Sequence, residues 1–308
     1  MKDATQKVKM KVFITGGRGF VGSHLTRFLL DQGCEVVGIS RSKHFGDFQH
    51  EQFRYVSADT TKPGSWQEEL KDTDVVVNLA GVSIFNYWTK KYKQAIYDSR
   101  VLTTRHLVEA LPDKNTISFI STSAIGYYGD RGDDLLTETE PPGSDFLARV
   151  CRDWETEAFK AEQKGSRVAI ARFGIVADKS GGAMKIMIPP FKLFVGGPLG
   201  DGTQFFPWIH LEDLINALWY LIKNDELRGP FNTCAPEPVR NRDLTKTIGS
   251  ILHRPTIFKV PKFAIRLVIG ELGSMVLSSQ RGKPEKLLNS GFEFQYPTFR
   301  QAMEEVLK

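Results

Sequence analysis

The chain has 308 residues, 41% of them hydrophobic and 25% charged, a balance typical of a globular protein with one large domain and a smaller one. Its formal net charge of +5 includes no block of consecutive Lys and Arg, so nucleic acid is not an expected partner. No apolar run approaches the roughly 20 residues that span a bilayer, and the start, MKDATQKVKM, lacks the apolar stretch of a signal peptide. We therefore expect a cytoplasmic protein with no membrane partner.

Short apolar runs alternate with longer helical stretches through the first half of the chain. The runs are apolar on successive residues, as expected for strands covered by helices on both faces. Together they predict βαβ units and a doubly wound, parallel α/β sheet. The expected strands are residues 11–15, 35–40, 53–58, 74–80, 117–122 and 167–173.

Beyond Gly174 the sequence changes to frequent Gly and Pro, and a helical pattern resumes after His210. From Val239 the pattern is mostly helical, with one short extended piece at 256–260. We predict a nucleotide-binding domain over 1–175, to which 208–235 return, and a smaller, mostly helical substrate-binding region from 176–207 and 236–308. Residues 263–277 are apolar at helical spacing, so we expect core there, with a helix against a partner chain as the alternative.

Cysteine and histidine usage argues against metal and hydrolase chemistry. Cys34, Cys151 and Cys234 are far apart in the chain and are expected to be small buried hydrophobes. No group of His, Cys, Asp and Glu has metal-ligand spacing, and neither a GxSxG elbow nor a Walker loop is present. No metal is therefore expected.

The strongest motif is a glycine-rich loop between the first expected strand and a helical pattern, SHLTRFLLDQG. In this context it predicts a dinucleotide-binding loop of the Rossmann type. Gly16 permits the tight turn, Gly19 lets a pyrophosphate approach the backbone, and Gly22 allows close packing of helix on strand, while the helix N-terminus attracts the anion. The loop comprises Thr15, Gly16, Gly17, Arg18, Gly19, Phe20, Val21 and Gly22.

The end of the second expected strand indicates which dinucleotide is bound. A carboxylate there would hold the ribose hydroxyls of NAD, but this strand ends in EVVGIS followed by Arg41. Ser40 and Arg41, with Arg18 close by, can instead hold a 2′-phosphate, so we infer NADP(H) in preference to NAD(H). The alternative is that both arginines are solvated surface charges. Asp59, after the third strand, is expected either to bind the adenine amino group or to cap a turn.

The loop TGGRGFVG, Asp59, NLAG (78–81) and STSAIGYYG (121–129) resemble, in order and spacing, the extended short-chain dehydrogenase/reductase family. More narrowly, GGAM (181–184) and GGPLGDGTQFFPWIHLEDL (196–214) resemble the epimerase-like subgroup of NAD-dependent epimerase/dehydratase relatives. The resemblance implies a Rossmann domain and a C-terminal region closing over a substrate, often a sugar nucleotide. It also implies that Ser123 occupies the place of the catalytic serine. The cofactor would be lined by Asn78, Leu79, Ala80, Gly81, Ser121, Ile175 and Val176.

One departure from the family pattern concerns the YxxxK motif, in which a lysine lowers the pKa of a catalytic tyrosine. By resemblance, Leu147 stands for the tyrosine and Cys151 for the lysine, and neither can do that acid/base work. Tyr127 or Tyr128, after the fifth strand, could present a phenol, with aromatic packing as the alternative.

Two further residues are candidates for the site. Arg100 stands where relatives often carry a polar amide and could face the cofactor or an anionic substrate, with surface ion pairing as the alternative. His210 beside Trp208 could transfer a proton, although a structural histidine is the simpler interpretation.

Two hypotheses of function remain. The first is an NADP(H)-dependent oxidoreductase or epimerase acting on an unidentified carbonyl or sugar-nucleotide-like small molecule. The second is a non-catalytic NADPH-binding sensor, suggested by the loss of the Tyr and Lys pair. Relatives frequently dimerise through paired helices, so the resemblance also leaves a homodimer open.

Overall fold

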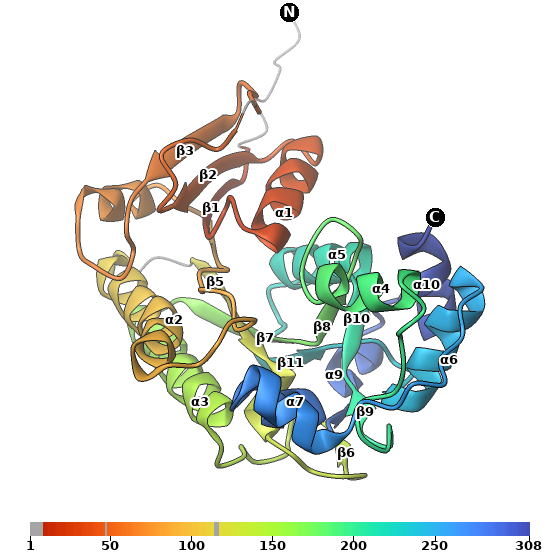
Figure 1. Cartoon of the computed structure of the whole chain (residues 1–308). Coiled ribbons are helices and arrows are strands. Elements are labelled where there is room, and N and C mark those ends of the chain that lie inside the picture. The colour runs from red at the N-terminus through yellow and green to blue at the C-terminus, as the bar shows by residue number, and fades with distance from the viewer. Residues whose placement is uncertain (1–8, 47, 114–116) are drawn as a thin grey trace, which may run out of the picture.

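A seven-stranded sheet forms the centre of the computed structural model, which describes residues 9–46, 48–113 and 117–308 (Figure 1). All six neighbouring pairs of strands are parallel, in the order β11-β7-β5-β4-β1-β2-β3. This confirms the predicted doubly wound α/β sheet. The strands are β1 (Lys11–Thr15), β2 (Glu35–Ser40), β3 (Phe53–Ser57), β4 (Val75–Asn78), β5 (Ser118–Ala124), β7 (Arg167–Phe173) and β11 (Gly229–Thr233).

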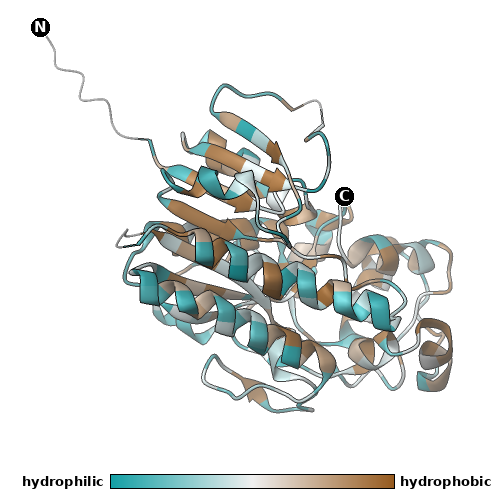
Figure 2. Cartoon of the chain, turned by 90° about the vertical axis from the view of Figure 1, so that its left-hand side faces the viewer, coloured by the Kyte–Doolittle hydropathy of each residue, from teal (hydrophilic) through white to brown (hydrophobic). Residues whose placement is uncertain are grey.

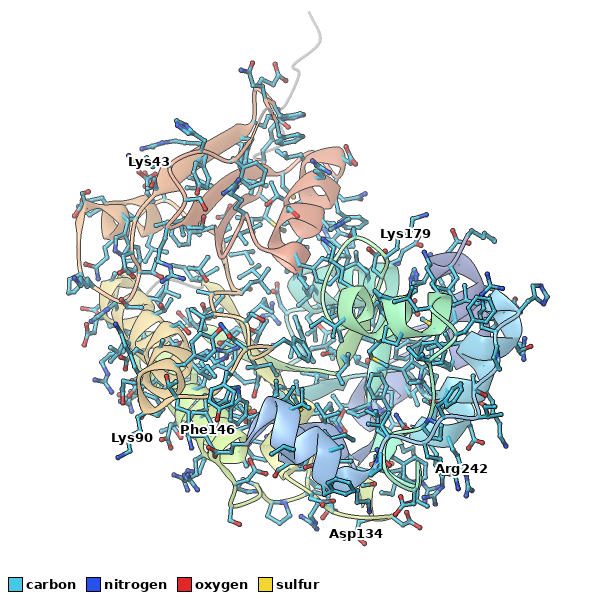
Figure 3. The ribbon with its side chains drawn as sticks, in the orientation of Figure 1. Lys43, Lys90, Asp134, Phe146, Lys179 and Arg242 are labelled. Atoms are coloured by element: carbon cyan, nitrogen blue, oxygen red, sulfur yellow. The ribbon has the colours of Figure 1, made fainter. Side chains whose placement is uncertain are left out.

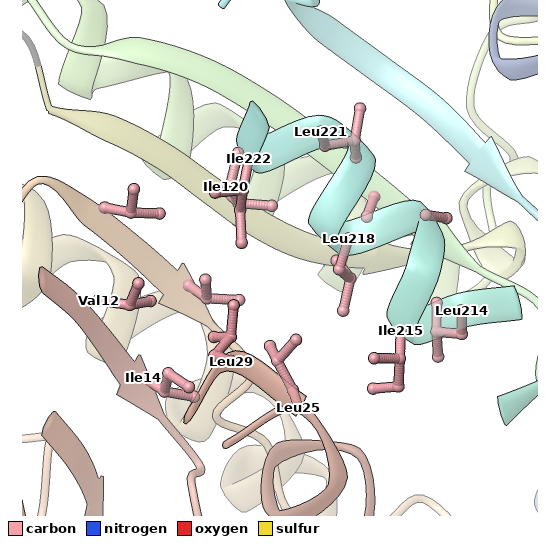
Figure 4. Packing of buried hydrophobic residues seen from close by; sticks show 14 of the residues in the cluster. Val12, Ile14, Leu25, Leu29, Ile120, Leu214, Ile215, Leu218, Leu221 and Ile222 are labelled. Carbon is pink, nitrogen blue, oxygen red and sulfur yellow. The ribbon is translucent and has the colours of Figure 1, made fainter. Parts of the chain in front are cut away.

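Helices cover both faces of this sheet, because alternate side chains of each strand point to opposite faces. On one face, Val12 and Ile14 pack against α1 (Phe20–Asp31) and α5 (Leu211–Lys223), as Figure 4 shows. On the other, Phe13 and Val76 contribute to a core with α2 (Lys90–Ala110), α3 (Phe146–Phe159) and η1 (Ser65–Leu70). In Figure 2, α2 and α3 turn their hydrophilic residues toward the viewer.

The C-terminal region is mostly helical and has a core of its own. That core lies between α4 (Met184–Lys192), α6 (Asn241–Leu252) and α10 (Phe299–Val306) and includes Met184, Ile248 and Phe299. Short strand pairs connect it to the sheet: β8 (Ile175–Ala177) with β10 (Trp208–His210), β9 (Phe205–Phe206) with β12 (Val239–Arg240), and β6 (Leu135–Leu136) with β13 (Arg281–Gly282). The remaining elements are η2 (Ile125–Tyr128), η3 (Lys160–Lys164), α7 (Lys262–Ile269), α8 (Leu272–Leu277) and α9 (Glu285–Asn289).

Two segments differ from the sequence-based expectations. Residues 256–260 form no strand and contribute one bridge, between Leu199 and Val260. The prediction of core for 263–277 is wrong for α7, where Phe263, Leu267 and Val268 are 74%, 82% and 74% exposed. Helical spacing of apolar residues shows that a helix has an apolar face but not that the chain itself covers that face.

Two other expectations can be compared with the structure. The cysteines at 34, 151 and 234 are all buried with free thiols, as predicted. Within the described ranges, none of the helices combines the length and the apolarity that crossing a bilayer requires.

Candidate functional site

The glycine-rich loop joins β1 to α1 at the point where the chain order of the sheet reverses. Strands β2 and β3 lie to one side of β1, and β4 and β5 lie to the other, which makes this the position where open α/β sheets bind ligands. The Gly19 N–H donates to the carbonyl oxygen of Gly16 (2.7 Å), and Gly19 forms the N-cap of α1. The free N–H groups of the first turn of α1 therefore face the expected anion position.

Close backbone approach explains two glycines of this loop. Gly16 has a φ of 67°, which favours glycine. A Cβ at Gly22 would overlap the carbonyl oxygen of Gly16, so any side chain there would push α1 away from the loop. The loop is thus shaped as a cradle that side chains would fill, and this shape fits a pyrophosphate. Arg18 is exposed at the rim of this cradle, while Phe20 and Val21 begin α1 and are partly buried.

A buried hydrogen-bond network fixes the ends of β1, β4 and β5 relative to one another. The Thr15 hydroxyl donates to Asn78 Oδ1 (2.7 Å) and accepts from the N–H groups of Leu79 and Ala80 (both 3.1 Å). Asn78 Nδ2 lies 3.3 Å from Ser121 Oγ. Thr15, Asn78 and Ser121 thus hold the strand ends in register, and Leu79 and Ala80 form the turn facing the loop.

The loop after β2 carries the residues expected at a 2′-phosphate. Arg41 is exposed, and the Ser40 hydroxyl lies 2.6 Å from that of Tyr55, which also donates to the carbonyl oxygen of Ser42 (2.6 Å). Tyr55 thereby sets the shape of this loop. Lys43, labelled in Figure 3, lines with Tyr55 a surface hollow of about 420 Å³ at this end of the sheet.

Asp59 lies at the end of β3, where it forms a turn. Its Oδ1 accepts hydrogen bonds from the N–H (3.1 Å) and the hydroxyl (2.8 Å) of Thr61. The carboxylate is exposed, so Asp59 can cap this turn and also contact an adenine amino group.

Ser123 lies on β5 and is 3% exposed. Its hydroxyl has no hydrogen-bond partner of good geometry in the described part of the chain, although the Cys151 thiol is its neighbour. Burial raises the pKa of Cys151 to about 11, so this thiol is neutral at physiological pH. Leu147 lies one turn before Cys151 on α3, in an apolar cluster with Ile269 and Met275 from the C-terminal region. The apolar cluster around Leu147 would disfavour a phenolate at that position.

A buried ion pair that the sequence analysis did not anticipate lies next to Ser123. Arg172 on β7 is the register partner of Ser123 and binds the Glu155 carboxylate through Nε and Nη2, both at 2.8 Å. Arg172 is 3% exposed and Glu155 is 5% exposed. The sequence signal for this ion pair was Arg172, a charged residue inside the mostly apolar run RVAIARF, because a buried charge requires a partner.

The two tyrosines after β5 interact with Arg172 in different ways. The Tyr128 hydroxyl is fully buried, donates to Asn232 Oδ1 (2.7 Å) and accepts from Arg172 Nη1 (2.8 Å). Burial raises the pKa of Tyr128 far above its ordinary value, and its surroundings match the packing alternative. The ring of Tyr127 stacks on the Arg172 guanidinium at 3.6 Å, and this residue is only partly buried. Burial raises the pKa of Tyr127 as well, so it remains a protonated phenol whose hydroxyl can donate a hydrogen bond.

Arg100 packs beneath the turn that follows β4. Its Nη1 donates to the carbonyl oxygen of Ile96 and its Nη2 to that of Val82, both at 3.1 Å. The guanidinium lies against Gly81, where a Cβ would come within 3.0 Å of Cζ. Burial lowers the pKa of Arg100, and the structure shows no carboxylate paired with it among the described residues. The charge is therefore available for an anion at this turn.

The GGAM segment closes over the start of α1. A Cβ at Gly181 would overlap the ring of Phe20, and one at Gly182 would lie 3.1 Å from that ring. Gly182 also packs near the carbonyl oxygen of Val176 on β8, next to Ile175. The two glycines thus bring the C-terminal region into contact with the phosphate loop.

His210 caps α5. Its Nδ1 accepts a hydrogen bond from the Glu212 N–H (3.3 Å), and its ring lies 3.9 Å from that of Tyr296. This is the structural interpretation, because an accepting Nδ1 requires a neutral imidazole with its proton on Nε2.

The free energy of unfolding should depend on pH in part through the His210 cap of α5. Burial lowers the pKa of His210, against smaller opposing effects of Glu212, Asp178 and Glu305. The neutral His210 imidazole therefore stabilises the fold fully above the pKa that it has in the unfolded state. This contribution is lost as the pH falls through the pKa of His210 in the folded state. Between about pH 7.5 and about pH 5.5, the free energy of unfolding should fall more in the wild type than in His210→Asn, which keeps a capping acceptor. Equal slopes in urea titrations of both proteins would contradict this assignment.

Several residues at the start of the long segment 196–214 pack its loop against neighbouring elements. Asn241 Oδ1 accepts from the Leu199 N–H (2.8 Å), and Lys262 forms an ion pair with Asp201 (2.8 Å). A Cβ at Gly202 would lie 2.8 Å from Arg242 Cβ. These contacts join the segment to α6 and α7.

Comparison with known proteins adds a family context. A sequence model of the NAD dependent epimerase/dehydratase family matches residues 12–234, and one of a domain of unknown function, DUF1731, matches 260–306. The chain is 35% identical over 304 residues to the chloroplastic epimerase family protein SDR39U1 homolog of Arabidopsis thaliana, covering 97% of this chain and 87% of that protein. It is 36% identical to epimerase family protein YfhF of Bacillus subtilis, with 97% and 98% covered.

Solved structures resemble it over a similar extent. The human epimerase family protein SDR39U1, crystallised with NADPH, has a TM-score of 0.84 and 29% identity, with 96% of this chain and 99% of that chain covered. UDP-glucuronic acid 4-epimerase from Bacillus cereus, in complex with UDP-glucuronic acid and NAD, has a TM-score of 0.77, 20% identity and coverage of 96% and 98%. At that identity the second likeness concerns the fold alone.

Proposed function

Because the chain belongs to the NAD dependent epimerase/dehydratase family, we propose that it binds NADP(H) and acts as an NADP(H)-dependent oxidoreductase or epimerase. The phosphate loop fits a dinucleotide, since side chains would fill its cradle and α1 directs its N-terminus there. A relative that shares the fold was crystallised with NADPH. Arg18, Arg41, Ser40 and the backbone of the loop would hold the phosphates.

The preference for NADP(H) rests on the end of β2. The strand ends at Ser40 and continues into exposed Arg41, without a carboxylate that would hold a ribose or repel a phosphate. Lys43 adds a further cation in the same loop. An Arg and phosphate pair is a strong, charge-assisted interaction, so this loop supports the 2′-phosphorylated cofactor.

Arg41→Ala should weaken NADPH binding by about tenfold to a hundredfold and leave NADH binding nearly unchanged, because only NADPH carries the 2′-phosphate. Titrations followed by protein fluorescence measure both affinities. Arg300→Ala removes the same charge far along the chain, on α10, and serves as the control. Preference of the wild type for NADH, or equal loss of both cofactors in Arg41→Ala, would refute the assignment.

The observation that supports chemistry beyond binding is the Ser123 hydroxyl, which is buried without a good partner next to a fixed ion pair. Bound NADPH supplies a hydride at its nicotinamide. Ser123 would donate a hydrogen bond to the substrate oxygen that gains negative charge, and the protonated Tyr127 phenol would be the proton donor. Arg100 would hold an anionic group of the substrate or cofactor. The substrate class remains a carbonyl or sugar-nucleotide-like small molecule.

This step is tested by following NADPH absorbance with a library of carbonyl and sugar-nucleotide compounds. Ser123→Ala should lower turnover while leaving NADPH affinity unchanged, since the serine is proposed to contact substrate oxygen. If no compound oxidises bound NADPH and no bound product is found, the enzyme proposal fails while the cofactor proposal stands.

A second candidate function is a non-catalytic NADPH sensor. It is favoured by Leu147, which lies in an apolar cluster, and by Cys151, whose thiol is neutral, at the positions where the family pattern has a Tyr and a Lys. This candidate predicts a protein partner whose capture from cell extract differs between NADPH and NADP⁺. The same partners under both conditions would count against it. We also propose that the protein is cytoplasmic and forms a homodimer. One relative is named as chloroplastic.

A further inference from the structure

Two segments of the C-terminal region expose many apolar side chains. Nine large apolar side chains from two segments are between 51% and 82% exposed. In the described part of the chain, three large apolar side chains outside these segments are also exposed, those of Tyr87, Leu135 and Leu288. We call the set of nine the apolar face; it comprises Ile186, Leu193, Phe194, Val195, Ile257, Phe258, Phe263, Leu267 and Val268.

The two segments lie side by side where residues 194–200 meet residues 254–260. The Val260 N–H donates to the carbonyl oxygen of Pro198 (3.0 Å), and the Gly200 N–H donates to that of Val260 (2.8 Å). The Arg254 guanidinium lies over the ring of Phe194 at 4.4 Å. Helix α7 follows directly, at the right of Figure 2, and exposes Phe263, Leu267 and Val268.

The same segments carry positive charge without any acidic residue. Residues 179–200 contain three Lys and no Asp or Glu, and residues 244–270 contain five Lys or Arg and no Asp or Glu. Lys185, Lys192 and Lys259 are exposed, and none of them forms an ion pair within the described part of the chain. These three lysines therefore add positive charge to the segments of the apolar face, whereas Lys262 is neutralised by Asp201.

We propose that the apolar face docks the protein on the surface of a bilayer that contains anionic lipids. Phe, Leu and Ile side chains at the level of the acyl boundary, with Lys at the headgroups, are the combination that binds such interfaces. A second copy of the chain fits this face poorly, since like charges would meet across the interface. The docking is peripheral, with α7 lying in the plane of the surface. The proposal departs from the sequence-based expectation of no membrane partner, which rested on the lack of an apolar run long enough to span a bilayer.

Flotation of the full-length protein with vesicles tests this proposal. We expect the protein to float with phosphatidylcholine vesicles that contain phosphatidylglycerol and to stay behind with phosphatidylcholine alone. Phe263→Ser with Leu267→Ser should lower the bound fraction at least about tenfold, because both side chains would enter the acyl boundary. Lys185→Glu with Lys192→Glu and Lys259→Glu should do the same without touching an apolar residue.

Matched controls separate docking from general effects of charge and apolarity. Lys71→Glu with Arg300→Glu and Lys308→Glu changes the net charge equally at exposed positions elsewhere, and Leu135→Ser with Leu288→Ser removes exposed apolar side chains elsewhere. Both should float like the wild type. The proposal is overturned if the wild type does not float, if the control variants lose binding equally, or if light scattering shows a wild-type dimer that Phe263→Ser with Leu267→Ser converts to a monomer.

Discussion

Arg172→Met is expected to lower the free energy of unfolding by about 3–5 kcal/mol, because it leaves the Glu155 carboxylate buried without its cation. It also removes a donor to the Tyr128 hydroxyl. The double variant Arg172→Met with Glu155→Leu should recover most of that loss, since both charges are then gone and the site is filled by apolar groups. Urea unfolding followed by circular dichroism measures all three proteins.

A more exposed arginine provides the control for this effect. The Arg105 side chain is 43% exposed and binds the buried Glu157 carboxylate at 2.9 Å, and Lys160 binds the same carboxylate at 2.8 Å. Arg105→Met should cost less than about 1 kcal/mol, since Glu157 keeps Lys160 as a cation and solvent screens the exposed guanidinium. If Arg172→Met and Arg105→Met cost the same, the Arg172 pair does not hold α3 against β7.

Gly22→Ala is expected to weaken NADPH binding at least about tenfold, since the new methyl group would displace the Gly16 carbonyl and with it the N–H groups proposed to face the pyrophosphate. Overpacking of this kind also costs stability, about 1–3 kcal/mol. The fluorescence titration gives the affinity, and thermal unfolding without cofactor gives the stability.

Gly64→Ala is the matched control, because Gly64 has an extended backbone and the nearest atom to a new Cβ, on Trp66, is 3.4 Å away. It should change neither quantity noticeably. Normal NADPH affinity in Gly22→Ala would show that the close approach of α1 to the loop does not matter for the cofactor.

The sequence predicted the central sheet and the phosphate loop because both are local patterns. Runs such as KVFIT and RVAIARF are apolar enough to identify buried strands, and the spacing of Gly16, Gly19 and Gly22 predicts the turn and the helix that follow. The short pairs β9 with β12 and β6 with β13 were not predicted, since two-residue strands leave no periodic pattern.

The surroundings of Ser123 depend on contacts that sequence spacing does not reveal. Arg172 and Glu155 are 17 positions apart, and Asn232 reaches Tyr128 across 104 positions. The sequence shows the apolar spacing of α7. Whether another element covers the apolar side of this helix depends on where the chain turns, which it does at Gly270. The placement of Leu147 at the position of the tyrosine followed from the resemblance alone.

The position of β11 at the edge of the sheet constrains how the chain can fold as it leaves the ribosome. Strand β7 finds its outer neighbour only when residues 229–233 have been synthesised, and the Glu138 carboxylate meets the Lys286 N–H (3.2 Å) later still. Until then the nascent chain exposes an unpaired strand edge, which is the kind of surface that chaperones shield and that aggregates otherwise. Completion of this fold thus waits for the segment from β11 onward, although the cofactor loop emerges long before it.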